Sequence, residues 1–140
     1  MRARPSRRGV AAIEFGLWLP VISVILLAII EYGWLLYRRS EVTRAVREGV
    51  RYAVVMPQTS VPDPITLAET RCETVLNDLN FDLSAATISG TYSDITGDAA
   101  GAPDTLTLDV QVPYIAVTGG LVPTPPFIAV SMSMMLQDSE

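Results

Sequence analysis

The sequence predicts an α+β protein with a long N-terminal transmembrane helix, which continues into a small domain of a second helix packed on a roughly three-stranded antiparallel sheet. Three observations lead to this prediction. Residues from Phe15 to Ile30 carry no charge, and the apolar run reaches Tyr37 with Glu31 as its only interruption. Apolar residues then recur at helical spacing from residue 42 onward. In the C-terminal part of the chain the apolar spacing changes to two, the period of a half-buried strand.

The apolar N-terminal run is long enough to cross a membrane. At about 1.5 Å per residue a helix over residues 11–37 reaches about 40 Å, more than the ~30 Å hydrocarbon core of a bilayer. A cleaved secretory signal is one alternative, but the run is too long and no small-x-small cleavage site closes it before Arg38. A buried helix of a soluble protein is the other. We therefore predict a membrane helix.

Charge divides the chain into two halves of opposite sign. Residues 1–51 hold nine of the ten arginines and four acids, a net charge of +5. Residues 52–140 hold one arginine and eleven acids, a net charge of −10, so the whole chain carries −5. No acidic residue lies among the arginines before the apolar run. By the positive-inside rule this favours a cytoplasmic N-terminus and an outward-facing acidic domain. An acidic domain also argues against nucleic-acid binding.

Few residues in this chain are suited to catalysis or metal binding. It has no histidine, and Cys72 is its only cysteine, so histidine-based triads, most zinc sites and internal disulfides are excluded. Cys72 is most simply a small buried apolar residue. The aspartates between residues 93 and 104 do not follow the spacing of a calcium loop. We expect no enzyme activity, no cofactor and no metal.

Two residues inside the apolar run have a special role in a membrane helix. Glu14 should lie near the cytoplasmic edge, because an unpaired carboxylate at the bilayer centre costs about 3 kcal/mol or more. It can snorkel there, or it can pair with a positive group such as the N-terminal amine of a neighbouring chain. Pro20 cannot donate a hydrogen bond to the carbonyl of Gly16, which predicts a kink, although prolines are also tolerated in membrane helices.

The outward membrane surface is predicted near residues 31–37. Tyr32, Trp34 and Tyr37 suit an aromatic belt at the membrane–water boundary, and we expect Glu31 to reach headgroups or water there.

Beyond the membrane the same helix is predicted to continue, with an apolar stripe that packs on the domain. Small residues in this stripe allow close approach of another backbone, and Glu48 is spaced to pair with Arg44 or Arg51. The stripe consists of Val42, Ala45, Val46, Gly49, Val50 and Ala53. The helix should end at Pro57. The predicted divisions are a basic leader at 1–9, a long helix at 10–56 with a membrane half at 10–37 and an amphipathic outer half at 38–56, and a domain at 57–140.

The domain begins with a second helix and ends with strands. This helix starts either at Asp63, as a cap before a proline at the first helical position, or one turn later at a Thr66-x-x-Glu69 capping box. Alternating segments near residues 86–92, 105–112 and 128–136 predict the three strands. The apolar, proline-rich loop at 113–127 either packs locally or forms a partner surface.

Short motifs at the N-terminus resemble a known family. Gly9 to Phe15 (GVAAIEF) is similar to a type IV-like prepilin, and the segments RRGVAAIEFGLWLP, IIEYGWLLYRR and AVREGVRYAVV follow in the order of the TadE-like family. Members of this family are minor pilins, or pseudopilins, of the tight-adherence pilus system. The resemblance covers roughly residues 7–55, and Trp18 is bulkier than the aliphatic residues expected early in such a helix.

The resemblance implies a processed minor pilin of the bacterial inner membrane, with a periplasmic domain. A prepilin peptidase would cleave between Gly9 and Val10, and Glu14 would then be the fifth residue and pair with the N-terminal amine of a neighbouring pilin. Phe15 belongs to the same register motif. Expected partners are the peptidase, major and minor pilins and the inner-membrane platform, with a role in pilus initiation, tip or assembly and in cell adhesion.

Two other functions are weighed against this one. The first is a single-pass inner-membrane protein that never polymerises and whose periplasmic domain binds proteins of the same machinery; it predicts an uncut N-terminus. The second is a small anchored periplasmic enzyme, which the absence of histidine, lysine and paired cysteine disfavours.

Overall fold

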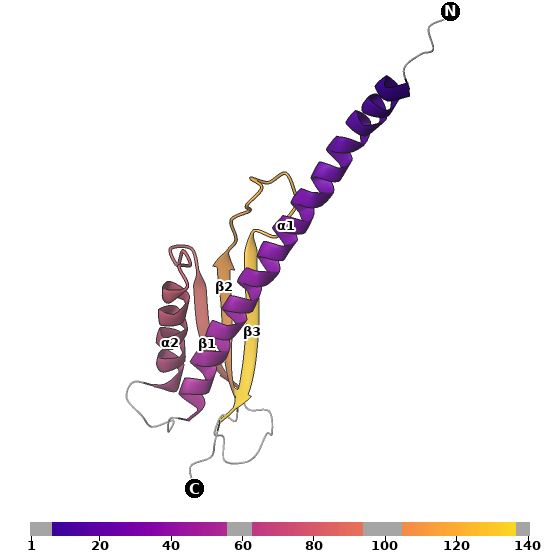
Figure 1. Ribbon diagram of the computed structural model, residues 1–140. Helices are drawn as coiled ribbons and strands as arrows, with labels where there is room; N and C mark the ends of the chain where they lie inside the picture. Colours follow the sequence, from indigo (N-terminus) through magenta and orange to yellow (C-terminus); the bar gives the residue numbers. More distant parts are fainter. Residues whose placement is uncertain (1–6, 56–62, 94–104, 137–140) are drawn as a thin grey trace, which may run out of the picture. The chain divides into compact units, whose positions relative to one another are not determined.

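The computed structural model of the chain describes residues 7–55, 63–93 and 105–136. Along the chain these form α1 (Arg7–Val54), α2 (Pro64–Asp78), β1 (Thr87–Ser93), β2 (Thr105–Pro113) and β3 (Phe127–Met135), as Figure 1 shows. The predicted α+β class is confirmed. Residues 1–6 of the leader, Pro57 and the aspartate-rich loop lie outside the described residues, so the predictions made for them are not addressed.

The chain divides into two compact units. The helix–loop unit consists of Met1–Trp34 and Ala116–Thr124, and the sheet unit consists of Leu35–Ile115 and Pro125–Glu140. Helix α1 contributes its N-terminal part to the first unit and its C-terminal part to the second.

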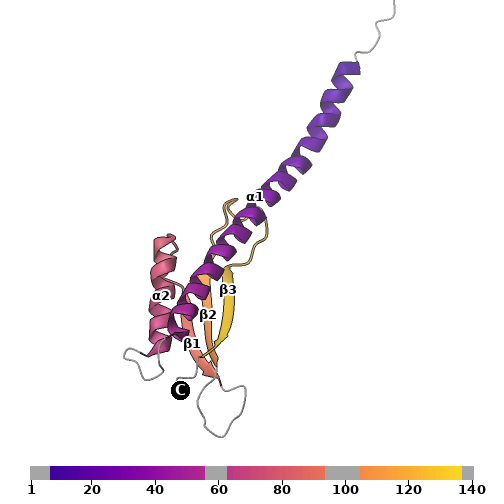
Figure 2. The same cartoon turned by 60° about the horizontal axis from the view of Figure 1, so that its bottom comes forward.

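The three strands form one antiparallel sheet in the order β1-β2-β3 (Figure 2). The register places apolar residues opposite one another on a single face: Leu108 lies between Gly90 and Met132, and Val110 lies between Ile88 and Val130. On the other face Thr107 and Ser133 share a hydrogen bond of 2.8 Å between their hydroxyl oxygens. The sheet therefore has one apolar and one polar face, as the period-two pattern predicts.

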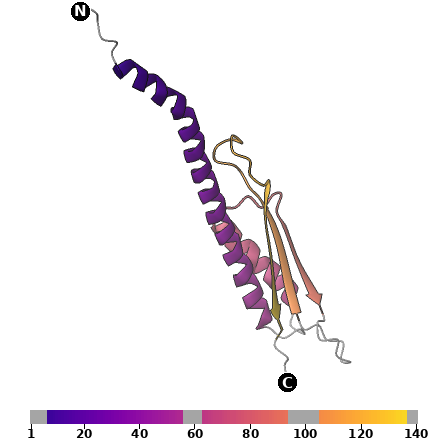
Figure 3. The same ribbon diagram turned by 90° about the vertical axis from the view of Figure 1, so that its right-hand side faces the viewer.

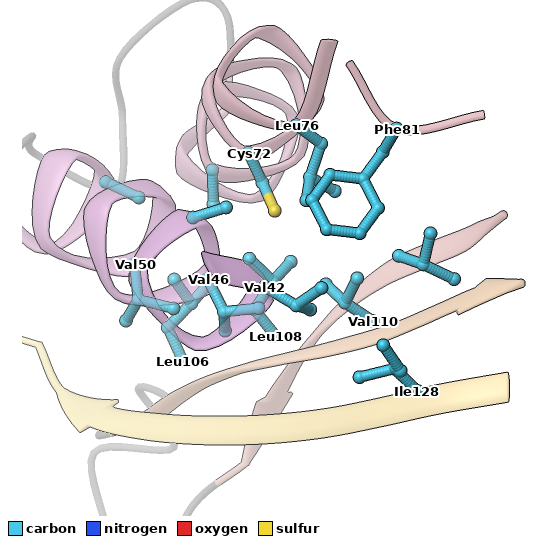
Figure 4. Packing of buried hydrophobic residues seen from close by; sticks show 14 residues of the cluster. Val42, Val46, Val50, Cys72, Leu76, Phe81, Leu106, Leu108, Val110 and Ile128 are labelled. Atoms are coloured by element: carbon cyan, nitrogen blue, oxygen red, sulfur yellow. The ribbon is translucent and has the colours of Figure 1, made fainter. Parts of the chain in front are cut away.

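Both helices of the sheet unit cover the apolar face of the sheet (Figure 4). Leu106, Leu108, Val110 and Val112 of β2 are buried, because β2 is the central strand. All six residues of the predicted stripe of α1 are buried there: Val42, Ala45, Val46, Gly49, Val50 and Ala53. Helix α2 contributes Ala68, Cys72 and Leu76 to the same core.

Two glycines permit the closest approaches in this core. A Cβ atom added to Gly49 would lie 2.7 Å from the backbone oxygen of Ala68, so α1 and α2 touch at backbone level. A Cβ atom added to Gly90 would lie 2.6 Å from Ile65, and the N–H of Gly90 donates to Glu69 Oε1 at 2.7 Å. At both positions the two elements can lie this close because glycine has no side chain.

The start of α2 follows the first of the two predicted alternatives. Asp63 is the N-cap and accepts a hydrogen bond from the N–H of Ile65 at 3.0 Å, and Pro64 occupies the first helical position. Glu69, the acid of the alternative capping box, binds β1 through Gly90. Likewise Glu48 pairs with Arg71 of α2 at 3.0 Å, and not with an arginine of its own helix as the spacing suggests.

The end of α2 is stabilised from α1. Asn80 adopts a left-handed backbone with φ of 58°, and the N–H of Phe81 donates to the carbonyl of Leu76 at 3.1 Å. The guanidinium of Arg38 lies 3.8 Å from the centre of the Phe81 ring and donates to the carbonyls of Leu79 and Asn80.

Candidate functional site

The apolar surface of α1 in the helix–loop unit is open to the surroundings. Phe15 is 62% exposed and Leu17 is 72% exposed, and the other large apolar residues between Val10 and Ile30 are exposed in the same way, except for the half-buried Leu27. In the part of the chain that the structure describes, one helix, Gly9–Val54, is long and apolar enough to cross a membrane, and no part of its most apolar stretch is buried. Burying one such side chain is worth about 1.5–3 kcal/mol, so exposure of this whole surface to water would rival the typical ~5–15 kcal/mol stability of a folded domain.

The predicted processing and register residues lie at the start of this surface. Gly9 and Val10 lie in the first turns of α1, and both are exposed. Glu14 and Phe15 follow one turn later and are exposed as well. Within this unit they are accessible to a second protein, and their roles in cleavage and in subunit register stay predictions.

Helix α1 continues without a break through Pro20. Ser23 donates its hydroxyl to the carbonyl of Leu19, the residue before the proline, at 2.8 Å, a back-bond that serine side chains often make within helices. Figure 3 shows α1 changing direction within its indigo N-terminal part.

The predicted exposure of Glu31 at the membrane surface is wrong for its side chain. The sequence suggests a carboxylate that reaches headgroups or water, whereas its side chain has no exposed surface. Its Oε2 accepts a hydrogen bond from the N–H of Thr118 at 2.7 Å, and its Oε1 accepts one from the N–H of Val117 at 3.2 Å. Burial of a carboxylate costs several kcal/mol, and hydrogen bonds to charged groups return about 1.5–3 kcal/mol each. The N–H groups of the loop therefore solvate the Glu31 carboxylate in place of the headgroups or water expected from the sequence.

A second contact joins the same turn of α1 to the same loop. Tyr32 donates its hydroxyl to the carbonyl of Pro123 at 3.0 Å. Two successive helical residues therefore bind both ends of the loop segment Ala116–Thr124, which we call the latch loop. The rings of Tyr32, Trp34 and Tyr37 remain partly exposed, and their position at a membrane surface stays a prediction.

The latch loop is shaped by two glycines. Gly119 and Gly120 have φ values of 65° and 89°, a left-handed backbone that other residues rarely adopt. The turn is closed by the N–H of Leu121, which donates to the carbonyl of Thr118 at 3.5 Å. The hydroxyl of Thr118 is buried, and among the described residues it has no hydrogen-bond partner. This turn brings the consecutive N–H groups of Val117 and Thr118 to Glu31.

Sequence reasoning left the loop at 113–127 open between local packing and a partner surface. Its backbone packs locally on Glu31 and Tyr32, yet Val117 and Leu121 stay exposed. The donors Val117 and Thr118 were missed, because backbone groups leave no residue-type signal. The only sequence feature that indicates a tight turn at this place is the dipeptide Gly119-Gly120.

The described residues offer no arrangement suited to metal chemistry. Among them, no three His, Cys, Asp or Glu side chains gather closely enough to hold a metal ion. Cys72 is fully buried, and burial together with the charge of Glu73 raises the pKa of its thiol to about 12. A thiol in this state is a packing residue in the core of the sheet unit.

These features define a class of protein: an α+β domain whose first helix begins with an exposed apolar segment long enough to anchor it in a membrane. The model of the TadE-like protein family matches residues 9–51, which confirms the resemblance found in the N-terminal motifs. This match associates the chain with the tight-adherence pilus system and its membrane. Neither the curated proteins nor the solved structures contain a significant match to the chain.

Proposed function

We propose that this protein is a minor pilin of a tight-adherence pilus. It is anchored in the inner membrane by residues 10–37, with a cytoplasmic N-terminus and a periplasmic domain, and contributes to pilus initiation, tip or assembly. The observation that carries this proposal is the family match over residues 9–51, because the matched segment contains both the exposed apolar helix and the exposed Glu14 near its start.

Processing is the first step of the proposed function. A prepilin peptidase cleaves between Gly9 and Val10, and removal of nine of the 140 residues leaves 131. The new amine of Val10 is then available to a neighbouring subunit, and the carboxylate of Glu14 is available to the amine of another. Two opposite charges in a low-dielectric environment hold adjacent helices in one register. The peptidase, the other pilins and the inner-membrane platform are the proposed partners, and the protein itself has no catalytic role.

The intact mass of the membrane-extracted protein tests processing. With an active prepilin peptidase we expect a chain that begins at Val10, and without it a chain that retains the leader. A leader retained in both strains would contradict the proposal and favour the alternative function, a non-polymerising single-pass protein whose periplasmic domain binds proteins of the same machinery.

A substitution at Glu14 tests the subunit contact separately from cleavage. Glu14→Gln keeps the size of the side chain and removes its charge. We expect the variant to stay in the membrane, to be processed, and to lose pilus-linked adhesion. Glu48→Gln is the matched control, because Glu48 lies in the outer half of α1 and binds Arg71 within its own chain. Unchanged adhesion in Glu14→Gln would contradict the role given to this carboxylate.

A further inference from the structure

The latch loop is attached to α1 at the point where the uncharged run ends. Glu31 is the first charged residue after Glu14, and both it and Tyr32 bind the loop through the hydrogen bonds described above. At about 1.5 Å per residue, the 17 positions from Glu14 to Glu31 rise about 26 Å along the helix. If Glu14 lies at one edge of the ~30 Å hydrocarbon core, Glu31 and the latch loop lie at the other edge.

The outward side of the latch loop is apolar and uncharged. Leu121 is 76% exposed and Val117 is 57% exposed, whereas the N–H groups of Val117 and Thr118 point to Glu31. No residue from Ala116 to Thr124 carries a charge. The loop therefore satisfies the N–H groups of Val117, Thr118 and Leu121 internally and exposes two aliphatic side chains, an arrangement that suits an apolar environment.

We propose that the latch loop inserts Val117 and Leu121 into the lipid at the outer membrane–water boundary, beside the point where α1 leaves the bilayer. This inference rests on the membrane anchoring given under the proposed function, and it adds a second membrane contact to the helix. Lipid is favoured over a protein partner because the loop is bound to the end of the apolar run itself. An irregular segment does not enter the hydrocarbon centre, but side chains can enter the boundary layer to a depth of about 5–10 Å.

Spin labels on the full-length protein in vesicles of phosphatidylethanolamine and phosphatidylglycerol test this inference. A nitroxide on Leu121→Cys reports whether the loop lies in lipid, through collisions with oxygen, which concentrates in lipid, and with a water-soluble nickel complex. Val24→Cys reports on the membrane helix, and Thr74→Cys on the exposed face of α2 reports on water. Cys72 stays in place, because it is fully buried, and the unsubstituted protein serves as the labelling control.

We expect the oxygen-to-nickel collision ratio at position 121 to lie between the ratios at positions 24 and 74 and to exceed that at position 74 several-fold. A lipid-like ratio at 24 with a water-like ratio at 121 would overturn the inference and leave the membrane anchor intact. An immobilised label at 121 that collides with neither reagent would indicate a protein contact and would overturn it too. A water-like ratio at 24 would overturn the membrane anchor and this inference together, whereas peptidase processing and adhesion are tested by the separate experiments above.

Discussion

The carboxylate of Glu31 and the backbone N–H of Thr118 are joined by a 2.7 Å hydrogen bond across 87 positions of sequence. The bond fastens a loop between two strands to the helix that precedes the whole domain. Because Val117 donates to the other oxygen of the same carboxylate, one side chain fixes two consecutive peptide groups. We expect this contact to determine how rigidly the latch loop is held.

Glu31→Gln should loosen the latch loop. The amide keeps the length of the side chain but replaces one acceptor oxygen with an NH₂ group, so at least one loop N–H loses its partner. A buried unsatisfied donor costs about 1–3 kcal/mol, which corresponds to roughly 5- to 150-fold faster local opening. Hydrogen exchange at Val117 and Thr118, measured in detergent micelles, checks this. The same substitution at the exposed Glu14 should leave the exchange unchanged, and unchanged protection in Glu31→Gln would show that the two bonds do not hold the loop.

Gly49→Ala should destabilise the sheet unit. The new Cβ atom would lie 2.7 Å from the backbone oxygen of Ala68, which cannot move without shifting α2. Overpacking of this kind costs about 1–3 kcal/mol, and chemical unfolding followed by near-ultraviolet circular dichroism measures it. Gly33→Ala is the matched control on the same helix, because its Cβ would meet nothing within 4 Å. Equal stability of the two variants would mean that α1 and α2 do not touch at Gly49.

The free energy of unfolding should fall as the pH rises above about 9. Burial raises the pKa of Cys72 from its ordinary value of 9.0 to about 12. Between pH 9 and pH 12 the thiol is deprotonated in the unfolded chain and protonated in the folded chain. The protonated thiol therefore contributes its full stabilisation of the folded state below pH 9, and this contribution is lost as the pH rises toward 12. The slope is at most about 1.4 kcal/mol per pH unit for one group.

Cys72→Ala isolates this contribution. The variant is expected to be less stable at neutral pH, because a buried side chain is shortened, but its stability should fall less steeply between pH 9 and 11. Burial and the neighbouring Asp63 also raise the pKa of Tyr92, so part of the slope should remain in both proteins. Identical slopes would place Cys72 in contact with solvent.

Asp63→Ala should shorten or weaken the start of α2. The carboxylate accepts the N–H of Ile65 at 3.0 Å, and it also accepts the hydroxyl of Tyr92 at 3.2 Å. Loss of an N-cap costs about 0.5–2 kcal/mol. Asp63→Asn is the matched control, since asparagine caps helices about as well, and thermal unfolding should rank the wild type and Asp63→Asn well above Asp63→Ala. If both variants were equally destabilised, the charge of Asp63 would matter more than the cap.

Much of the sheet unit could be predicted from the sequence because its signals are local. The stripe from Val42 to Ala53 follows helical spacing, and the three strands alternate over their whole length. Such patterns record which side of an element is apolar, and they require no knowledge of its partner. The sequence allows two starting positions for α2. The tertiary structure selects the cap at Asp63, because Glu69, the acid of the alternative capping box, binds the backbone of β1 instead.

The sequence by itself determined the apolar N-terminal helix, the family motifs and the apolar face of each element. Only the tertiary structure decided where charged side chains find their partners: Glu48 pairs with Arg71, and Glu31 binds the backbone of the latch loop. The physical reason is that an apolar face accepts almost any apolar neighbour, whereas a buried carboxylate requires a donor at one distance and direction. For Glu31 that donor is a backbone N–H, which every residue except proline carries, so no residue type in the sequence could mark it.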